Sequence, residues 1–374
     1  MSLRNEPPFR ADHVGSLLRP ESLKQARDQH AAGTLSKEEL RAAEDAAIRD
    51  VVKLQQDIGL QSVTDGEFRR KFWHLDFIER LAGMGHTGPA MDSHFHNEAG
   101  QTQFSSPGFG AIGRIGLKSD DSPIFGADFS FLKSVVTGGQ PKMTIPSPSM
   151  VDYRSAPPAK SVYPDPEEYW SDISAAYVQQ IRGLADLGCT YLQLDDTTLA
   201  YLNDPVERER QAALGKDSAH QHQRYIKNIN AALKDRPAGL TITTHLCRGN
   251  FRSSWVAEGG YDFVADELFN KLEVDGYFLE FDDSRSGTFE PLRFVPPGKL
   301  VVLGLVTSKR PTLESKDDLK RRIDEAAQYV PLDQLCLSPQ CGFSSTVEGN
   351  ALTVEEQWAK LRLIVETAHE VWSE

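Results

Sequence analysis

Eight short apolar runs recur along the 374-residue chain, and most are separated by segments of helix length. Such runs are typical of strands that are buried on both faces. In chain order they are residues 9–16, 62–67, 142–149, 191–196, 240–247, 276–281, 300–306 and 335–342. Strands that alternate with helices favour a parallel sheet. The pattern predicts an α/β fold, a (β/α)8 TIM barrel, with a doubly wound open sheet as the alternative.

Five segments between the runs show the periodicity of an amphipathic helix. The first begins at Ser36, which forms a capping box with Glu39, and it ends at Gly59. The second begins at Asp165, has a proline at its first helical position, and ends at Gly188. The predicted helices cover residues 36–59, 165–188, about 205–234, 315–329 and 353–372.

The alternation is interrupted at about residues 83–142, in a stretch rich in Gly, Ser and His. We expect a loop or hairpin inserted after the second strand of a single TIM-barrel domain that spans residues 1–374. The stretch contains GFGAIG, residues 108–113, which matches the G-x-G-x-x-G motif of dinucleotide-binding folds. No clear strand precedes this motif and the residues after it are not helical, so we assign no dinucleotide site to it.

Composition argues against several classes of function. The formal net charge of −13 is spread along the chain without a stripe of Lys and Arg, which argues against a nucleic-acid partner. No apolar stretch is long enough to cross a membrane and no signal peptide is recognisable, so we expect a cytoplasmic protein. Of the four cysteines, too few for a disulfide framework, Cys189 and Cys336 are predicted to be buried thiols. A homo-oligomer remains open.

Polar side chains close nearly every apolar run. In a (β/α)8 barrel the active site lies at the carboxyl ends of the strands, so residues far apart in sequence meet at one mouth. Polar residues also occur at strand ends without a function, an explanation that suits the serines well and the cysteines poorly. The residues at these ends are Ser16, Glu67, Ser147 with Ser149, Asp195, His245 with Cys247, Glu280, Thr307 with Ser308, and Cys341.

His245 and Cys247 stand two residues apart on one predicted strand, so their side chains point to the same face. An imidazole beside a thiolate suits zinc, and Glu280 and Cys341 would complete a set of four ligands. The alternative is that both cysteines are small buried side chains and that His245 is a hydrogen-bonded core residue. Spacing alone leaves both interpretations open, because one H-x-C pair is a weaker signal than paired C-x-x-C units.

Six strand-end segments resemble, in order and spacing, those of a known family, the catalytic barrel of cobalamin-independent methionine synthase. The segments are HVGSLLRP, GLQSVTDGEFRR, YLQLDD, THLCRGN, YFLEFDDSRSG and SPQCGFSS. The resemblance covers about residues 8–372, nearly the whole chain. It implies a zinc-dependent methyltransferase that activates a thiol, homocysteine, and methylates it to methionine, with a folate or a simpler methylated compound as the methyl donor.

The resemblance also implies roles for individual residues, with zinc ligands at His245, Cys247, Glu280 and Cys341. It implies a homocysteine site at Gly15, Ser16, Glu67 and Asp195. Ser16 would meet the substrate carboxylate, and the two acids its ammonium group. Two thiolates and one carboxylate would give zinc a negative ligand set and keep an added thiolate electron-rich. One ligand must yield to the thiol, and Glu280, the only oxygen ligand, is the one expected to move during catalysis.

Three departures from the family pattern concern the methyl donor. Full-length enzymes of the family carry a second, N-terminal barrel that helps to bind a polyglutamylated folate, and we expect this chain to lack it. The seventh-strand motif of the family carries an Asp and a proton-donating His, whereas GLVTSKRP offers Thr307 and Lys309. Tyr201 stands where the family has an acidic folate contact. We therefore expect the protein to activate the thiol as the family does and Lys309 to be a catalytic residue. The methyl donor is either a folate or a simpler methylated compound.

Two other functions remain open. One is zinc-dependent alkyl transfer to another thiol, as in the alkyl-coenzyme M transferases of the same superfamily. Coenzyme M would need cationic residues for its sulfonate, whereas Glu67 and Asp195 favour an amino acid. The other is a zinc-binding or thiol-binding protein without turnover, which an assay with homocysteine and several methyl donors distinguishes from an enzyme.

Overall fold

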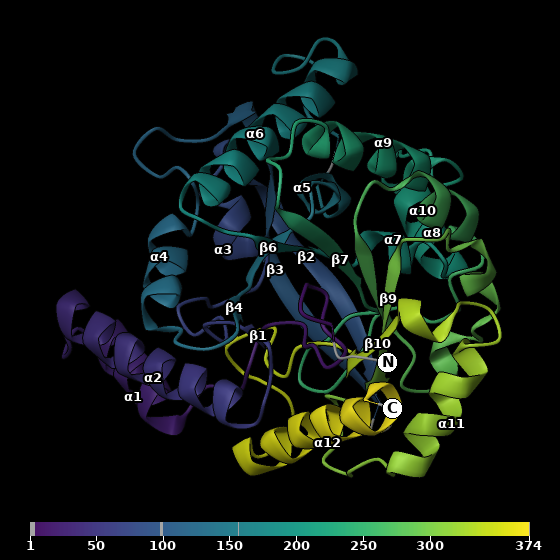
Figure 1. Cartoon of the computed structure of the whole chain (residues 1–374). Helices are drawn as coiled ribbons and strands as arrows, with labels where there is room; N and C mark the ends of the chain where they lie inside the picture. Colours follow the sequence, from purple (N-terminus) through teal and green to yellow (C-terminus); the bar gives the residue numbers. More distant parts are fainter. Residues whose placement is uncertain (1–3, 98–99, 156, 374) are drawn as a thin grey trace.

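A parallel sheet of six strands lies at the centre of the computed structural model, which describes residues 4–97, 100–155 and 157–373 (Figure 1). Its strands are β5 (Met143–Pro146), β6 (Tyr191–Asp196), β7 (Thr241–Leu246), β8 (Gly276–Glu280), β9 (Leu300–Val306) and β10 (Leu335–Pro339). Neighbours in the sheet follow the order of the chain, from β5 at one edge to β10 at the other. All five pairings are parallel. These strands coincide with the last six predicted runs.

The first two predicted runs lie between the two edges of this sheet. Strand β1 (Ser62–Val63) pairs in parallel with β4 (Gln140–Pro141), directly before β5. Ala11 forms a parallel bridge with Leu337 of β10. The chain therefore forms a (β/α)8 barrel, as predicted. The first two runs pair over far fewer residues than expected, and the first turns away at Gly15, whose φ of +135° an L side chain rarely adopts.

Helices surround the strands, which is the arrangement that buries both faces of a parallel sheet (Figure 1). The α-helices of the described residues are α1 (Glu21–Ala31), α2 (Lys37–Asp57), α3 (Leu75–Ile78), α4 (Gly126–Val135), α5 (Ser149–Tyr153), α6 (Pro166–Asp186), α7 (Thr198–Tyr201), α8 (Pro205–Ala213), α9 (Gln221–Leu233), α10 (Ala265–Lys271), α11 (Lys316–Ala326) and α12 (Val354–Trp372). Short 3-10 helices lie at Ser284–Ser286, Glu290–Phe294 and Leu332–Gln334.

Capping residues fix the starts of the predicted helices. Ser36 and Glu39 form the expected capping box at the start of α2, and the Asp165 side chain accepts a hydrogen bond at the start of α6. The single helix predicted over residues 205–234 is wrong, because the chain breaks into α8 and α9. Gly215, with φ +80°, lies at this break and permits a turn that other residues disfavour. Helix α1 was not predicted.

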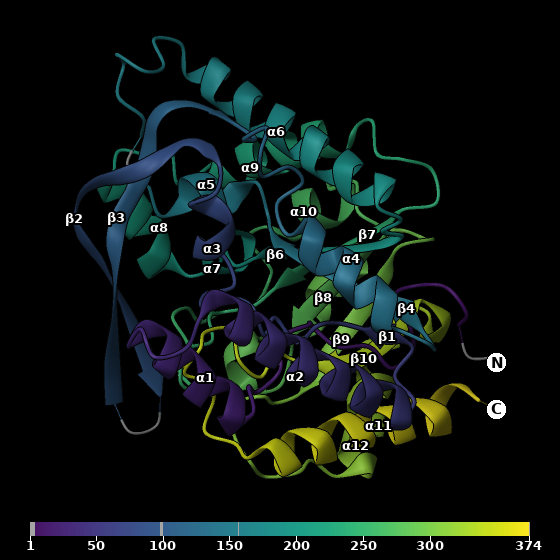
Figure 2. The ribbon, with the colours of Figure 1, turned by 90° about the vertical axis from the view of Figure 1, so that its left-hand side faces the viewer.

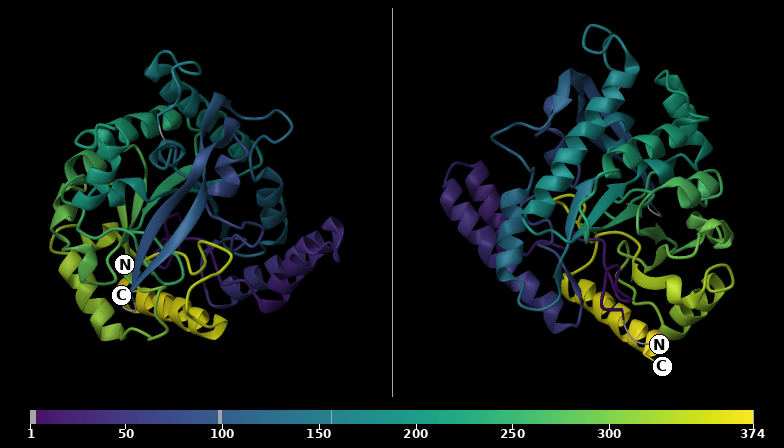
Figure 3. Two further views of the ribbon diagram at one scale, coloured as in Figure 1. Left: turned by 180° about the vertical axis from the view of Figure 1, so that it is seen from behind. Right: turned by 45° about the horizontal axis from the view of Figure 1, so that its top comes forward.

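A long antiparallel hairpin, β2 (Ala82–Asn97) and β3 (Gly100–Gly116), lies in the stretch that interrupts the alternation of strands and helices. The GFGAIG segment lies inside β3, paired with β2, and no helix follows it directly. Figure 2 shows the hairpin along one side of the molecule, and in the rear view of Figure 3 it crosses in front of the barrel strands. His96 of β2 and Trp255, in the loop after β7, exchange backbone hydrogen bonds of 2.7 and 2.9 Å.

The core fills the barrel and the space between its strands and the surrounding helices. Every residue of β5, β6, β8, β9 and β10 is buried, as their apolar composition predicted. The two cysteines predicted to be buried thiols, Cys189 and Cys336, are 2% and 0% exposed. Burial raises the pKa of each to about 12. Among the described helices, none has the length and apolar character needed to cross a membrane.

Candidate active site

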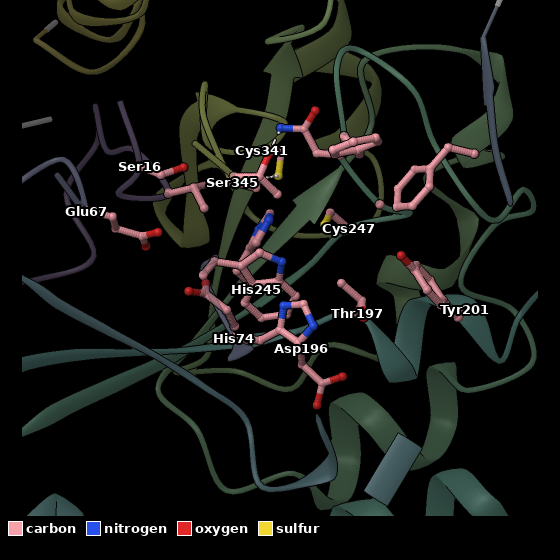
Figure 4. Close-up of a pocket in the computed structure, with 18 of the residues that line it drawn as sticks. Ser16, Glu67, His74, Asp196, Thr197, Tyr201, His245, Cys247, Cys341 and Ser345 are labelled. Carbon is pink, nitrogen blue, oxygen red and sulfur yellow. Dashed lines mark hydrogen bonds between the residues drawn. The ribbon is translucent and has the colours of Figure 1, made fainter. Parts of the chain in front are cut away.

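A cavity opens at the carboxyl ends of the barrel strands (Figure 4). Six of the predicted site residues line it, namely Ser16, Glu67, Asp195, His245, Cys247 and Cys341. Parallel strands bring residues that are hundreds of positions apart to one edge, as expected for this fold. Gly15, Glu280 and Lys309, which were also predicted for the site, are not among the residues that line this cavity.

Two thiols and an imidazole form a close group in the cavity wall. One ligand atom each from His245, Cys247 and Cys341 lies within 4.8 Å of the other two. His245 belongs to β7, Cys247 follows that strand directly, and Cys341 follows β10 by two residues. The group therefore joins two strand ends that are not neighbours in the sheet. Two sulfurs and a nitrogen at this spacing could hold a soft divalent metal ion.

The imidazole of His245 is buried beside the two thiols. The residue is 3% exposed, and neither ring nitrogen has a hydrogen-bond partner in the described part of the chain. Leaving a buried polar atom unsatisfied costs about 1–3 kcal/mol. Ring nitrogens that are free of other hydrogen bonds leave His245 able to act as a metal ligand.

The pKa values of the two thiols in the group are shifted in opposite directions. A hydrogen bond from Cys247 lowers the pKa of Cys341 well below its usual value, with help from His245 and against the effect of burial. The same hydrogen bond, together with burial, raises the pKa of Cys247 well above its usual value. Burial alone would lower the pKa of His245, but Cys341 and nearby carboxylates raise it. A cation that binds here would displace protons from the group.

Glu280 lies outside the close group of thiols and imidazole. It is the last residue of β8 and is fully buried. Its Oε2 accepts a 2.7 Å hydrogen bond from the Arg248 backbone N–H, and its Oε1 lies 3.3 Å from Arg285 and 3.5 Å from Lys309. Burial would raise the pKa of Glu280, but Lys309, Arg248 and Arg285 outweigh it and lower the pKa to about 2. The carboxylate is charged and held by cations.

The acids predicted to bind an ammonium group, Glu67 and Asp195, form an acidic wall of the cavity, in which Asp195 is the strand neighbour of His245. Glu67 has φ +60°, a strained backbone conformation for a residue with a side chain. Its Oε1 accepts a 2.7 Å hydrogen bond from Thr144, while its Oε2 is buried without a partner among the described residues. Burial raises the pKa of Glu67, and it raises the pKa of Asp195 to about 7. Both carboxyls would therefore gain from a positively charged ligand.

Glycines shape the same wall. A Cβ on Gly15 would lie 2.8 Å from the Thr144 side chain. The carbonyl of Gly15 accepts a hydrogen bond from the Thr64 hydroxyl. A Cβ on Gly342 would come within 1.9 Å of the Ser16 hydroxyl oxygen. Gly15 therefore positions Ser16, and Gly342, directly after Cys341, leaves room for it.

Several other strand-end polar residues serve the fold. The Asp196 carboxylate accepts hydrogen bonds from Ser149 and from Thr198 and Leu199 at the start of α7. The hydroxyl oxygens of Ser147 and Ser149 lie 3.0 Å apart, within hydrogen-bond distance. Thr307 accepts a hydrogen bond from the Lys309 backbone, and Ser308 donates to Gln340 and the Gly342 carbonyl. These hydrogen bonds agree with the alternative that polar residues also occur at strand ends without a function.

The sequence did not single out the aromatic lining of the cavity, which we call the aromatic wall and which consists of Trp73, Phe95, Tyr201 and Phe251. Phe95 comes from the hairpin and packs against Phe251 with ring centroids 5.3 Å apart. His74 lies beside Trp73, is 4% exposed, and has no hydrogen-bond partner for either ring nitrogen in the residues described. Trp73, His74 and Phe251 lie in loops and Phe95 lies in the hairpin, where no periodicity marks them. Only Tyr201 was noted, from its place after the fourth strand.

Fold and site together define a (β/α)8-barrel protein with a thiol and imidazole group at its catalytic mouth. Residues 139–370 match the family described as cobalamin-independent synthase, catalytic domain. The chain is 50% identical over 370 residues to YxjG of Bacillus subtilis (strain 168), described as an uncharacterized protein, covering 99% of this chain and 96% of YxjG. It belongs to the cobalamin-independent methionine synthase family and is a methionine synthase-like methyltransferase.

Solved structures agree with this assignment. A vitamin-B12-independent methionine synthase structure described for Listeria monocytogenes is 37% identical, with a TM-score of 0.79 and coverage of 99% of this chain and 100% of that one. A B12-independent methionine synthase from Shewanella sp. W3-18-1, solved in complex with selenomethionine, is 19% identical, with a TM-score of 0.71 and coverage of 97% and 98%. The second likeness concerns the fold alone.

Proposed function

We propose that the protein is a zinc-dependent methyltransferase that methylates the thiol of homocysteine to give methionine. The observation that carries the proposal is the buried group of His245, Cys247 and Cys341, whose ligand atoms lie within 4.8 Å of one another. The unpartnered nitrogens of His245 and the low pKa of Cys341 fit a metal ligand set. Bound zinc would lower the pKa of an added thiol and keep its sulfur nucleophilic.

The amino-acid end of homocysteine fits the acidic wall. Its ammonium group would pair with the buried carboxylates of Asp195 and Glu67, of which Glu67 also lies 3.3 Å from Arg70. Its carboxylate would meet Ser16, which Gly15 and Gly342 position. The side chain would then point its sulfur toward the thiol and imidazole group.

The reaction requires a charged sulfur and an aligned methyl group. The thiol loses its proton, its sulfur forms a bond to the methyl carbon, and the donor's bond to that carbon breaks with the electron pair staying on the donor. The aromatic wall of Trp73, Phe95, Tyr201 and Phe251 would hold the donor and exclude water from this step.

Two features favour a donor other than the folate triglutamate of the full-length enzymes. Tyr201 lines the cavity where the family has an acidic folate contact. Lys309, which stands in place of the family's proton-donating His, is paired with Glu280 and is not among the residues lining the cavity. Sulfonium donors leave without needing a proton, and their positive charge suits an aromatic wall. We therefore expect a sulfonium compound to outperform a methylated folate.

The test is methionine formation from homocysteine by zinc-loaded protein, with methyltetrahydrofolate triglutamate and sulfonium donors at equal concentration. Turnover that depends on both zinc and homocysteine supports the proposal. No turnover with any donor, although zinc is bound, favours the binding-protein alternative. Turnover with coenzyme M but not with homocysteine favours the alkyl transferase alternative. A cytoplasmic location, the absence of a nucleic-acid partner and the oligomeric state stay predictions from the sequence.

A further inference from the structure

One imidazole in the lining of the active-site cavity lies outside the group of thiols and imidazole. His74 lines the cavity and is 4% exposed, and neither of its ring nitrogens forms a hydrogen bond with the described residues. Burial and the charge of Arg154 lower the pKa of His74 well below its usual value, so the ring is neutral and offers one N–H donor and one acceptor nitrogen. A ligand that supplies the missing partner would therefore be bound favourably.

The backbone around His74 is held in place by hydrogen bonds. The Trp73 N–H donates a 3.1 Å hydrogen bond to the Ser345 carbonyl, and the Asp76 carboxylate accepts a 3.1 Å hydrogen bond from the Phe72 N–H. The ring of His74 lies against the ring of Trp73, with centroids 4.6 Å apart. A side chain fixed in this way loses little conformational entropy when a ligand binds to it.

A single cation accompanies this imidazole. Arg154 follows helix α5, is half-buried, and is the one Arg or Lys among the described residues that line the cavity. Its charge acts on both His74 and Tyr201, since it tends to lower the pKa of each. In Figure 4, His74 and Tyr201 lie apart from Ser16 and Glu67, which are proposed to bind the amino-acid end of homocysteine. The cavity therefore has an acidic part that suits a cation and another part that suits an anion.

We propose that His74 and Arg154 form an anion subsite of the cavity, which binds a carboxylate of the methyl donor while the donor's sulfonium group lies against the aromatic wall. This inference rests on the proposed function and narrows the donor to sulfonium compounds that carry a carboxylate. The guanidinium of Arg154 would pair with the carboxylate, and the N–H of the neutral imidazole would donate a hydrogen bond to it.

Methyl transfer changes the charge at sulfur and leaves the donor carboxylate as it was. The homocysteine thiolate forms a bond to the methyl carbon, and the donor's carbon–sulfur bond breaks with the electron pair staying on the donor sulfur. A thiolate and a sulfonium thus give two neutral thioethers. An interaction that is equally strong before and during the reaction lowers KM and leaves kcat unchanged. The subsite should therefore select the donor through KM.

The test compares dimethylsulfoniopropionate with its carboxamide, which keeps the sulfonium and lacks the negative charge. With zinc-loaded protein and homocysteine, kcat/KM for the acid should exceed that for the amide at least about tenfold, mostly through KM. Arg154→Met should reduce this preference to less than about twofold, and Arg154→Lys should restore most of it. His74→Phe should reduce it about threefold, and His74→Gln, which keeps an N–H donor, should reduce it less. Lys160→Met is the matched control, because Lys160 is an exposed cation that does not line the cavity, and it should keep the full preference.

Binding to the zinc-free protein gives a readout that does not depend on turnover. In calorimetric titration, the acid should bind at least about fivefold more tightly than the amide to the unchanged protein, and about equally to Arg154→Met. Equal kcat/KM for acid and amide, or a preference that survives Arg154→Met, overturns the inference. A loss of homocysteine affinity in Arg154→Met with the donor preference intact also overturns it, because the subsite would then bind the homocysteine carboxylate.

The two readouts separate this inference from the proposed function. If no donor supports turnover but the zinc-free protein still prefers the acid, the proposed function fails and the anion subsite stands. If homocysteine is methylated while acid and amide bind and react equally, only the anion subsite fails.

Discussion

Two buried polar clusters lie at opposite ends of the barrel, and they differ in how completely they are satisfied. At the amino ends of the strands, Asp12 and Lys142 form an ion pair with 0% side-chain exposure. Asp12 accepts hydrogen bonds from Ser62, Tyr191 and the backbone of Phe9 and His13, while Lys142 donates to Asp12 and the His13 carbonyl. At the carboxyl ends, His245 and His74 have no partners among the described residues.

The difference separates stabilising groups from functional ones. A buried charge with all its hydrogen bonds made holds neighbouring strands together and has nothing left to offer a ligand. A buried polar group without partners lowers the stability of the folded protein. That stability is recovered only when a bound ligand supplies the missing interaction. This agrees with the general division of (β/α)8 barrels, in which the amino-terminal face serves stability and the carboxyl-terminal face serves chemistry.

The largest expected effect is on stability, at the satisfied cluster. Lys142→Met should lower the free energy of unfolding by about 3–5 kcal/mol, because the Asp12 carboxylate is left buried without its cation. Zinc content per folded molecule should not change. Chemical unfolding and metal analysis of the same preparation measure both quantities. A loss of zinc without a loss of stability would contradict the division between the two ends.

At the carboxyl ends of the strands, Cys341→Ser should have the opposite effect from Lys142→Met, namely a loss of zinc without a loss of stability. The unchanged protein should bind about one zinc per chain, and the variant should lose more than about 100-fold in zinc affinity because the group loses a thiolate. Its free energy of unfolding should change by less than about 1 kcal/mol in the absence of metal. Cys189→Ser is the matched control, since Cys189 is equally buried and lies outside the group. Full zinc occupancy in Cys341→Ser would argue against the site.

Asp195→Asn should weaken homocysteine binding about tenfold while zinc is retained, because one charged partner of the ammonium group is lost. The neighbouring Asp196→Asn is the control. Asp196 caps α7, so its loss should reduce stability and leave homocysteine affinity within about threefold. Calorimetric titration measures the homocysteine affinity of both variants. An equal loss of affinity in Asp195→Asn and Asp196→Asn would argue against a role for Asp195 in binding the amino-acid end.

The pH dependence of ligand binding should follow the same carboxyl. Burial raises the pKa of Asp195 to about 7, so the group is largely neutral below pH 7 and charged above it. Methionine has no thiol to ionise, and its affinity for zinc-free protein should therefore rise by up to about tenfold from pH 6 to pH 8. Asp195→Asn should flatten this rise. A rise of equal size in the variant would show that another group is responsible.

The smallest effect is expected at His74. Burial, assisted by the charge of Arg154, lowers the pKa of His74 well below its usual value, so the ring is neutral and both of its nitrogens lack partners in the described chain. His74→Phe should raise the free energy of unfolding by about 1 kcal/mol and lower turnover, because stability is gained where a polar contact to substrate is lost. Thermal unfolding measures the change in stability, and steady-state kinetics measures the change in turnover. Reduced stability would indicate that His74 already has a partner.

The sequence predicted best where a local pattern had a physical cause. Strands β5 to β10 are short apolar runs that are buried on both sides, and such runs differ clearly from amphipathic helices. The break between α8 and α9 was missed because helical periodicity continues across Gly215. The aromatic wall was missed because loops carry no period, and Phe95 reaches the cavity only through the docking of the hairpin at Trp255.

By itself, the sequence determined the barrel, the order of its strand ends, and the residue types that meet at the mouth. The spacing of His245 and Cys247 places both side chains on the same face of one strand. The resemblance of the strand-end motifs indicated the family. The tertiary structure decided the distances: it brings Cys341 to that pair and leaves Glu280 beside Lys309 and Arg285. Which partner a charged side chain takes depends on burial and on competing charges from distant segments, and no local pattern encodes that competition.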